Sequence, residues 1–316
     1  MDGEGAAYGR AEPLGEGVQR VTAPNPSPMT YRGTCCYLVG DEAEALLIDP
    51  GPALPAHRAA LMAALGSRRL IAVLVTHSHV DHSPSAPAIA AETGAPVLAF
   101  GSHGAGMSAQ MQSLSEGPGG AALAGGEGAD AAFAPDRCLA DGDAVAVGTR
   151  RLIALHTPGH LSNHLSFRIE GSGTVFTGDA VMGWSTTLVS PPEGDMAAQV
   201  ATLHRMAGLV AEMAGGGLAP RFLPGHGEAV ADPAALLAQQ IAHRGARREA
   251  LVEALADGPA TAPDLAARLY IETPPALLPA AARNVLATLL QLEAEGAAEP
   301  CGPLTAEVAF RLTGAA

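Results

Sequence analysis

The chain has 316 residues, of which 48% are hydrophobic and 16% charged, so it is long and apolar enough for about two folded domains. Its net charge is −14, and all 18 basic residues are arginines because the sequence contains no lysine. The lack of lysine excludes a lysine Schiff base and a P-loop lysine. The acidic balance disfavours a general nucleic-acid or anionic-membrane surface.

The cysteines and the N-terminal residues predict a cytoplasmic protein. The four cysteines have neither the spacing of a disulfide framework nor that of a cysteine-based zinc site. Residues 1–20 are acidic and glycine-rich and lack the apolar run of a secretory signal. No segment has the roughly 18 consecutive apolar residues that a membrane-spanning helix needs, so we expect no membrane partner.

The N-terminal part of the chain alternates predicted strands with predicted helices. Helices are expected over Ala56–Leu65 and from Ser83 to Glu92. Short apolar runs predict strands at Val18–Ala23, Thr34–Val39, Ala45–Asp49, Ile71–Thr76 and Pro96–Phe100. This alternation favours an α/β architecture in which helices cover sheets.

The middle of the chain begins with an irregular segment. Residues 101–136 are rich in glycine, serine, alanine and methionine, which predicts a long loop. We interpret it as a lid over the substrate, with a poorly ordered excursion as the alternative. A helix is expected over Asp195–Ala214. Further strands are expected at Ala144–Val147, Arg151–His156, His164–Ile169, Thr174–Thr177 and Arg221–Leu223.

The composition changes after Ala229, and the pattern there is typical of a winged helix. Three helices and a hairpin are expected, over Pro233–Ala256, Ala262–Tyr270, Pro279–Glu295 and Ala297–Arg311. We therefore divide the chain into a domain over residues 1–230 and a linker helix with a winged-helix-like domain over residues 231–316. The third helix carries Arg283 against Glu293 and Glu295, so we expect no DNA binding.

A dense group of potential metal ligands follows the strand expected over Ile71–Thr76. Residues 76–82 read Thr-His-Ser-His-Val-Asp-His. Alternate residues of an extended segment point the same way, so His77, His79 and Asp81 can converge, and His82 can join them as the chain bends. Imidazole and carboxylate groups are ligands of zinc, manganese and iron. The segment therefore predicts a metal site.

The sequence resembles the metallo-β-lactamase superfamily, whose signature is His-x-His-x-Asp-His. Further motifs of that family match in order: Ile-Asp-Pro-Gly at 48–51, Thr-Pro-Gly-His at 157–160, Thr-Gly-Asp at 177–179 and Pro-Gly-His-Gly at 224–227. The match spans residues 17–230. It implies a four-layer αββα sandwich, followed here by the small C-terminal winged-helix-like domain. It also implies two divalent metal ions, with zinc favoured and iron or manganese as alternatives.

The resemblance gives each matched residue a role. It makes Asp81 and Asp179 the catalytic carboxylates. The ligands that it implies are His77, His79 and His160 for one ion, Asp81, His82 and His226 for the other, and Asp179 between the two. A hydroxide held by two cations is a nucleophile at neutral pH, and the same ions polarise a carbonyl or phosphoryl oxygen.

Three more residues are expected near the ligands. Asp49 matches an aspartate that supports the ligands in this family. His164 matches a supporting position too, with a simply packed histidine as the alternative. Trp184 is the only tryptophan of the chain and follows Asp179 closely, so it is either a wall of the substrate site or an anchor for its own loop.

Three functions stay open. A metal-dependent hydrolase of a small ester, thioester, lactone or amide is favoured. A metal-dependent endoribonuclease or phosphodiesterase is the alternative, because the winged helix narrows the resemblance to the β-lactamase-like protein 2 group, whose animal member cleaves RNA. The net charge of −14 disfavours RNA as a partner. A di-iron redox enzyme is the third reading, and the sequence shows no flavin or rubredoxin-like segment for it.

Overall fold

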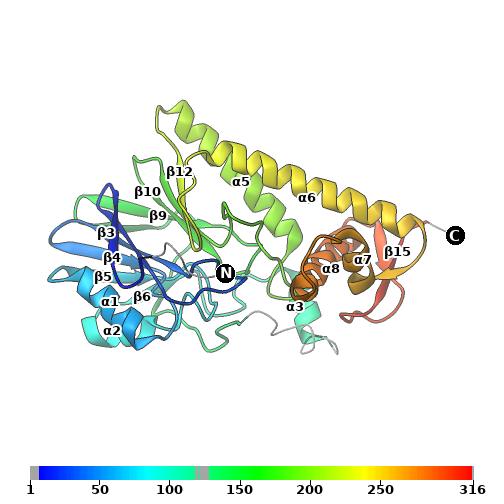
Figure 1. Ribbon diagram of the computed structural model, residues 1–316, viewed down its shortest axis with the longest axis horizontal. Coiled ribbons are helices and arrows are strands. Elements are labelled where there is room, and N and C mark those ends of the chain that lie inside the picture. Colours follow the sequence, from blue (N-terminus) through cyan, green and yellow to red (C-terminus); the bar gives the residue numbers. More distant parts are fainter. Residues whose placement is uncertain (1–6, 118–119, 121–127, 315–316) are drawn as a thin grey trace.

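A computed structural model describes residues 7–117, 120 and 128–314 of the chain. Two β-sheets pack face to face, and helices cover the outer face of each, which gives four layers (Figure 1). The α/β class and the αββα sandwich expected from the sequence are therefore confirmed.

The first sheet has seven strands in the order β1-β2-β3-β4-β5-β6-β7. Its N-terminal strands pair antiparallel, whereas β4, β5, β6 and β7 run parallel to one another. The strands are β1 (Ala11–Gly15), β2 (Val18–Thr22), β3 (Cys35–Gly40), β4 (Glu44–Ile48), β5 (Arg69–Leu74), β6 (Val97–Ala99) and β7 (Arg137–Cys138). The parallel strands β4 and β5 are nearly continuous apolar runs because both faces of the sheet are covered.

The second sheet has five strands in the order β12-β11-β10-β9-β8. All pairs are antiparallel except that of β11 with β12, which is parallel. The strands are β8 (Ala144–Val147), β9 (Arg150–His156), β10 (Leu165–Ile169), β11 (Thr174–Gly178) and β12 (Arg221–Pro224). Side chains of both sheets, including Ile48, Leu74, Phe167 and Phe176, form one buried cluster between the layers.

Helices close the two outer faces of the sandwich. Leu61 and Ile89 lie in the cluster on the outer face of the first sheet, and Met206 and Leu237 lie in the cluster on the second. The helices that carry them are α1 (Pro55–Leu65), α2 (Ala86–Thr93), α5 (Met196–Gly215) and α6 (Pro233–Ala256). Asp195 caps α5 by accepting hydrogen bonds from two backbone N–H groups of its first turn.

The topology brings the carboxyl ends of five strands to one edge of the sandwich. Strands β4 and β5 are parallel, and β9, β11 and β12 share a direction in the second sheet. The loops that leave these ends carry all the motifs that the sequence singled out. Two sheets thus deliver their ligand-bearing loops to the same place.

The C-terminal unit consists of the end of α6, further helices and a small sheet, and the winged helix predicted there is confirmed. Figure 1 shows α6 running from the sandwich into this unit. Its other elements are β13 (Ala260–Thr261), α7 (Ala262–Leu269), the 3-10 helix η1 (Pro275–Leu277), α8 (Leu278–Ala294), β14 (Ala298–Pro300) and β15 (Ala309–Leu312). Because α6 packs against α5 and also against α7 and β15, one helix belongs to both parts. The division at residue 230 stays a prediction.

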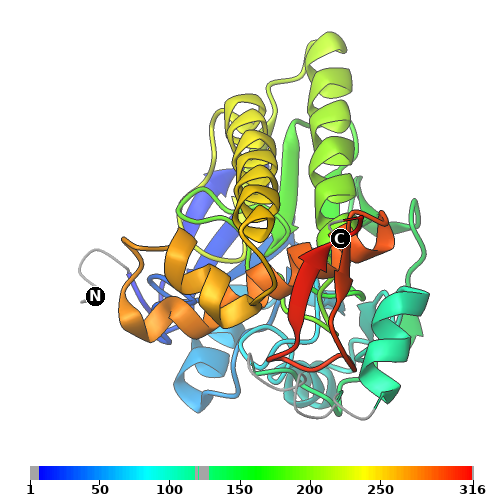
Figure 2. The ribbon, with the colours of Figure 1, turned by 90° about the vertical axis from the view of Figure 1, so that its right-hand side faces the viewer.

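The segment over residues 101–136 differs from the long loop that the sequence predicted. It contains helix α3 (Ala109–Glu116), which Ser108 caps. Met111 and Leu114 of α3 are buried in the apolar cluster of the C-terminal unit, and Figure 2 shows α3 beside that unit. The segment is therefore partly a docked helix, and residues 118–119 and 121–127 of the predicted lid lie outside the described residues.

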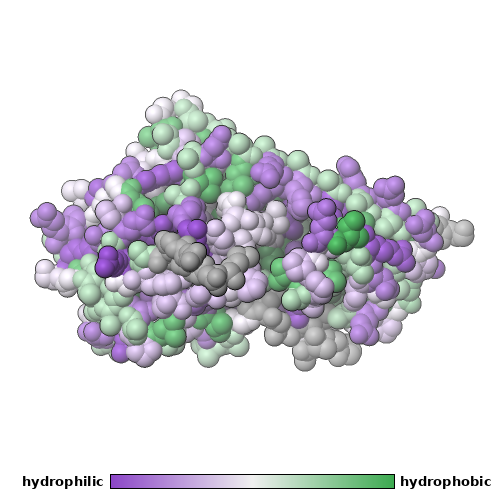
Figure 3. All heavy atoms as spheres, viewed as in Figure 1, coloured by the Kyte–Doolittle hydropathy of each residue, from purple (hydrophilic) through white to green (hydrophobic). Residues whose placement is uncertain are grey.

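Polar and weakly polar residues cover most of the face seen in Figure 3, and hydrophobic residues occur there in small groups. Within the described part of the chain, the large apolar side chains with high exposure are Met29, Leu54, Val80 and Ile271. Among the described residues, no helix combines the length and apolarity needed to cross a membrane.

Candidate metal centre

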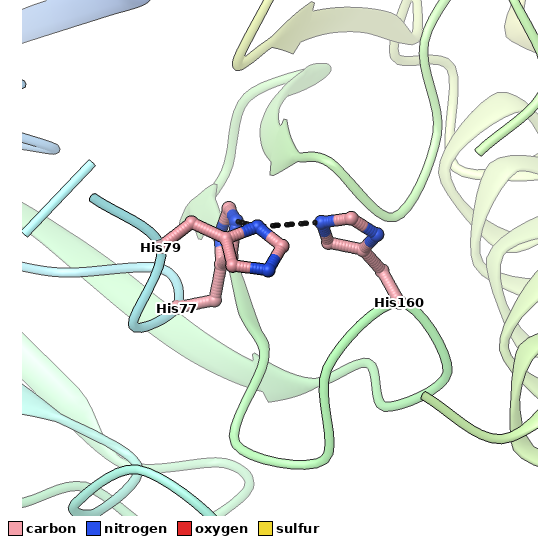
Figure 4. A group of neighbouring side chains, drawn as sticks. All are labelled: His77, His79 and His160. Atoms are coloured by element: carbon pink, nitrogen blue, oxygen red, sulfur yellow. Dashed lines mark hydrogen bonds between the residues drawn. The ribbon is translucent and has the colours of Figure 1, made fainter. Parts of the chain in front are cut away.

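Three histidines from two loops meet at the edge of the sandwich. His77 and His79 follow β5, and His160 follows β9, as Figure 4 shows. The Nε2 atoms of His77 and His160 each lie 3.1 Å from Nδ1 of His79. All three side chains are buried. These residues form the first ligand group.

A second group lies beside the first and contains a carboxylate. The Nε2 atoms of His82 and His226 are 3.3 Å apart, and Oδ2 of Asp81 lies 3.3 Å from the former and 3.2 Å from the latter. His226 follows β12, so this group also joins the two sheets. Asp81 is its most exposed member, with 21% of the side chain accessible.

Asp179 lies between the two groups. Its Oδ2 atom is 3.3 Å from Nε2 of His226 and 3.7 Å from Nε2 of His160, and its Oδ1 atom is 3.6 Å from Nε2 of His82. Oδ1 is buried and has no hydrogen-bond partner among the described residues. A Cβ on Gly225 would lie 2.3 Å from this oxygen, so the glycine leaves room for the carboxylate. The structure thus brings together all seven residues that the sequence predicted as ligands.

Hydrogen bonds to Nδ1, on the side away from the cluster, fix the orientation of three of the imidazole rings. The Nδ1–H groups of His82, His160 and His226 donate to Asp49 Oδ2, Leu188 O and Gly33 O. These acceptors carry no proton, so Nδ1 carries one, and the Nε2 atom of each ring faces the cluster. This arrangement is typical of metal-binding histidines.

Asp49 supports both ligand groups, as the sequence predicted for a supporting residue. Besides His82, it accepts hydrogen bonds from the backbone N–H of Thr76 at 2.7 Å and from its hydroxyl at 2.8 Å. Because that hydroxyl donates to Asp49, its oxygen accepts from Nδ1–H of His77, which again leaves Nε2 free for the cluster. Asp49 holds a left-handed backbone conformation with φ of 51°, which non-glycine residues rarely adopt.

His164 is hydrogen-bonded to the backbone of Asp179, as expected for a supporting residue. Its Nε2 accepts a hydrogen bond from the backbone N–H of Asp179 at 3.1 Å. The ring proton must therefore sit on Nδ1, which donates to the hydroxyl of Thr157 at 2.9 Å. Burial holds the pKa of His164 well below its ordinary value, so the ring stays neutral and keeps this acceptor.

The two ligand groups differ in their electrostatics. Burial, together with the neighbouring histidines, lowers the pKa of His77 well below its ordinary value and that of His79 to about 3. In the second group, burial opposes protonation, but the carboxylates of Asp81 and Asp179 outweigh it and raise the pKa of His226 to about 9. The same carboxylates also raise the pKa of His82.

The chemistry of these donors fits divalent cations. In the first group, two bare Nε2 atoms face Nδ1 of His79, whose single proton could serve only one of them. In the second, the Nε2 atoms of His82 and His226 face a carboxylate, which favours either a proton or a cation between them. A cation placed among each set would satisfy every lone pair, and nitrogen with oxygen ligands suits zinc, iron and manganese.

Trp184 lies beside the centre. Its ring stacks on Tyr31 with 5.2 Å between the centroids, and a Cβ on Gly227, the residue after His226, would lie 2.8 Å from Cδ1 of the indole. The indole N–H is buried without a partner among the described residues. Trp184 thus packs on the loop that carries a ligand and has a free donor beside the site.

Sequence reasoning missed contacts between the segment over residues 101–136 and the metal-binding loop. The hydroxyl of Ser83 donates to Asp130 Oδ2 at 2.7 Å, and the N–H of Asp130 donates to Ser78 O at 2.8 Å. Ser78 Oγ also lies 3.0 Å from Nδ1 of His103 and accepts from Asn163 at 3.0 Å. No local pattern marks these residues, because each contact joins distant parts of the chain.

The comparison with family models agrees with this geometry. The model described as "Metallo-beta-lactamase superfamily" matches residues 29–234. The chain belongs to the metallo-β-lactamase superfamily. A second model, described as "Beta-lactamase associated winged helix domain", matches residues 261–300. The chain is therefore a hydrolase of this superfamily with an appended winged helix.

Two similar curated proteins match nearly the whole chain, and a third matches about half of it. The "Beta-lactamase-like protein 2 homolog" of Drosophila melanogaster is 29% identical in an alignment of 304 positions that covers 90% of each chain. That of Caenorhabditis elegans is 27% identical and covers 91% of this chain and 88% of its own. An "Atrochrysone carboxyl ACP thioesterase" of Aspergillus chevalieri is 32% identical over 54% of this chain and 48% of its own.

Solved structures support the fold over nearly the whole chain. A metallo-beta-lactamase family protein from Thermus thermophilus is 26% identical, with a TM-score of 0.72 over 95% of this chain and 100% of its own. A beta-lactamase domain protein from Burkholderia ambifaria is 22% identical, with a TM-score of 0.76 over 97% of this chain and 94% of its own. The C-terminal unit is thus part of the shared architecture.

Proposed function

We propose that the chain uses two divalent metal ions, preferably zinc, to hydrolyse a small acyl substrate, with a thioester or ester favoured over a lactone or amide. The observation that carries this proposal is the position of Asp179 between two groups of ligands. A single carboxylate can serve two cations, and the flanking groups supply the ligands His77, His79 and His160 on one side and Asp81, His82 and His226 on the other.

Bound divalent ions supply Lewis-acid polarisation of an acyl oxygen and a water of lowered pKa. The chain's own contribution is to orient the donors. Asp49 and Leu188 hold the rings of His82 and His160 through their Nδ1–H groups, and His164 holds the backbone of Asp179. The stacked rings of Tyr31 and Trp184 would form a wall beside the acyl group.

The choice of an acyl substrate rests on charge and on the relatives. A net charge of −14 repels a polyanion, so RNA binding would need a local basic surface. A relative that is 32% identical over 54% of this chain is named a thioesterase. A small thioester therefore fits better than RNA as the substrate.

DNA as a partner is opposed by the position of α8. In many winged helices the corresponding helix faces the DNA. Here α8 is buried along most of its length, and Val285, Leu286 and Leu289 pack into the apolar cluster of the C-terminal unit. Arg283 donates to Ser190 Oγ at 2.7 Å and so faces the catalytic domain.

A substrate and metal screen tests the proposal. The chain is stripped with a chelator, reloaded with Zn²⁺, Mn²⁺ or Fe²⁺, and assayed on a p-nitrophenyl ester, an acyl thioester, a β-lactam and a single-stranded RNA. We expect Zn²⁺-dependent thioester or ester hydrolysis that the variant Asp179→Asn loses. The variant Asp257→Asn changes an exposed carboxylate and serves as the control. Faster metal-dependent cleavage of RNA than of any acyl substrate would overturn the substrate class.

A further inference from the structure

The segment Thr187–Ser190 lies between the candidate metal centre and the C-terminal unit and is hydrogen-bonded to both. On the side of the centre, Leu188 O accepts from Nδ1–H of His160 at 2.7 Å. The hydroxyl of Thr187 donates to the backbone carbonyl of Asp179 at 2.6 Å. The segment thus holds one ligand of the first group and the backbone of the shared carboxylate.

On the other side, the segment is held by α6 and α8. The N–H of Val189 donates to Asn284 Oδ1 at 2.9 Å. Arg244 donates through Nη1 to the same oxygen at 3.4 Å and through Nη2 to Thr187 O. Val189 and Ala287 belong to one small buried apolar cluster, so packing reinforces these hydrogen bonds.

One peptide group connects the two sides. The C=O of Leu188 and the N–H of Val189 belong to the same planar peptide and point in opposite directions. The first accepts from His160, and the second donates to Asn284, so the hydrogen bonds form a continuous chain from ligand to C-terminal unit. Hydrogen bonds in such a chain polarise one another.

Arg244 ends this chain with a positive charge that no carboxylate neutralises among the described residues. Burial lowers the pKa of its guanidinium to about 10, which still leaves it charged at neutral pH. Its charge is directed at two oxygens, Thr187 O and Asn284 Oδ1. Burying a charge costs free energy unless hydrogen-bond acceptors surround it. The guanidinium of Arg244 therefore favours the conformation of the segment that keeps Thr187 O against it.

We propose that Asn284 and Arg244 are positioning residues for the metal centre, because they fix the peptide that orients His160 and, through Thr187, the backbone of Asp179. This inference rests on the proposed two-metal function. It makes the C-terminal unit a part of the active-site architecture, since the residues that set the segment lie on α6 and α8.

The test compares two substitutions of Asn284 in the full chain, with Co²⁺ as the probe. Asn284→Leu removes the acceptor, whereas Asn284→Asp keeps it and gives Arg244 a carboxylate. Gln291→Leu also replaces an amide by leucine further along α8, where the amide donates to Glu295 of its own helix and to no other described residue. Titration of the metal-free proteins is followed by the visible absorption of bound Co²⁺, with thioester or ester hydrolysis as a second readout and thermal unfolding as a check of folding.

We expect Asn284→Leu to weaken Co²⁺ binding about tenfold, the lower end of the effect of groups that orient metal ligands. The Co²⁺ affinities of Asn284→Asp and Gln291→Leu should stay within about twofold of that of the parent chain, because neither variant removes a group that orients a metal ligand. Equal binding by the Leu variant and the parent, or equal losses in both Asn284 variants, would overturn the inference. Failure of the parent itself to bind Co²⁺ would instead overturn the proposed function, and this inference with it.

A second pair of variants tests Arg244. Arg244→Met should weaken Co²⁺ binding in the same direction as Asn284→Leu. Arg247→Met, one turn along α6, is the matched control, since Arg247 bonds to Leu269 O and stacks on Tyr270 within the C-terminal unit. Equal effects of the two methionine variants on Co²⁺ binding would contradict a specific role for Arg244.

Discussion

The two ligand groups are built from the same kinds of loop but differ in charge. The group of His77, His79 and His160 contains only imidazoles, and burial keeps the first two neutral. The other group places His82 and His226 against Asp81, and the carboxylates favour a positive charge there. Asp179 touches both groups. The centre is therefore asymmetric, with one neutral half and one half that favours a cation or protons.

Removing the charge shared by both halves should have the largest effect. Asp179→Asn keeps the shape but leaves no carboxylate between the groups, so we expect a loss of at least about a hundredfold in kcat/KM and lower metal content. Metal analysis and acyl hydrolysis measure both. Parent-like activity and metal content in this variant would show that Asp179 does not join the two halves.

Removing one ligand from either half should leave the other half able to bind its ion. His79→Gln and His226→Gln should each retain about one ion per chain, because the other half keeps its ligands. His204→Gln, on the exposed face of α5, is the control. Metal analysis of the purified variants decides the matter. Loss of all metal in both variants would mean that the halves bind a single ion together.

Removing supporting groups should have smaller and unequal effects. Asp49→Asn disturbs His82 directly and His77 through Thr76, so we expect losses of about 10–100-fold in metal affinity. Thr76→Val removes the partner of His77 but leaves the bond between Asp49 and His82, and should affect only the neutral half. Co²⁺ titration measures the metal affinity of each half. Equal losses of affinity in both halves of Thr76→Val would contradict this separation.

Changing the wall beside the centre should have the smallest effect. Trp184→Ala removes the stack on Tyr31 but no ligand, so we expect KM to rise by about two- to tenfold, as the loss of an aromatic contact predicts. Metal content should stay at the parent value. Steady-state kinetics with the favoured acyl substrate measure the change, and a loss of metal instead of affinity would make Trp184 a structural anchor.

Local sequence patterns could predict the ligands because each lies directly after a strand. His77, His79, Asp81 and His82 share one loop, and the later motifs follow β9, β11 and β12, whose ends meet at one edge. The structure brings these residues together, and that they hold metal ions stays a prediction. His164 had two interpretations; the structure places its Nε2 against the N–H of Asp179, and a role in supporting a metal ligand stays a prediction.

Contacts between distant segments could not be predicted from local patterns. Helix α3 lies in a segment rich in glycine and serine and was not predicted, because the residues that it packs against lie in the C-terminal unit. Strand β1 is also short and mostly exposed, so it shows no apolar run. Asn284 has no motif around it, and its role depends on the N–H of Val189, which is 95 residues away. Such pairs are set by tertiary packing rather than by sequence periodicity.

Two divalent ions at this centre drive hydrolysis, in the function that we propose. Its most direct test is a titration of the metal-free chain with Zn²⁺, in which acyl hydrolysis and bound metal are measured at each step. The account predicts that activity is absent without metal and reaches its plateau at about two ions per chain, as in two-metal hydrolases. Full activity in the metal-free chain, or a plateau at one ion per chain, would contradict it.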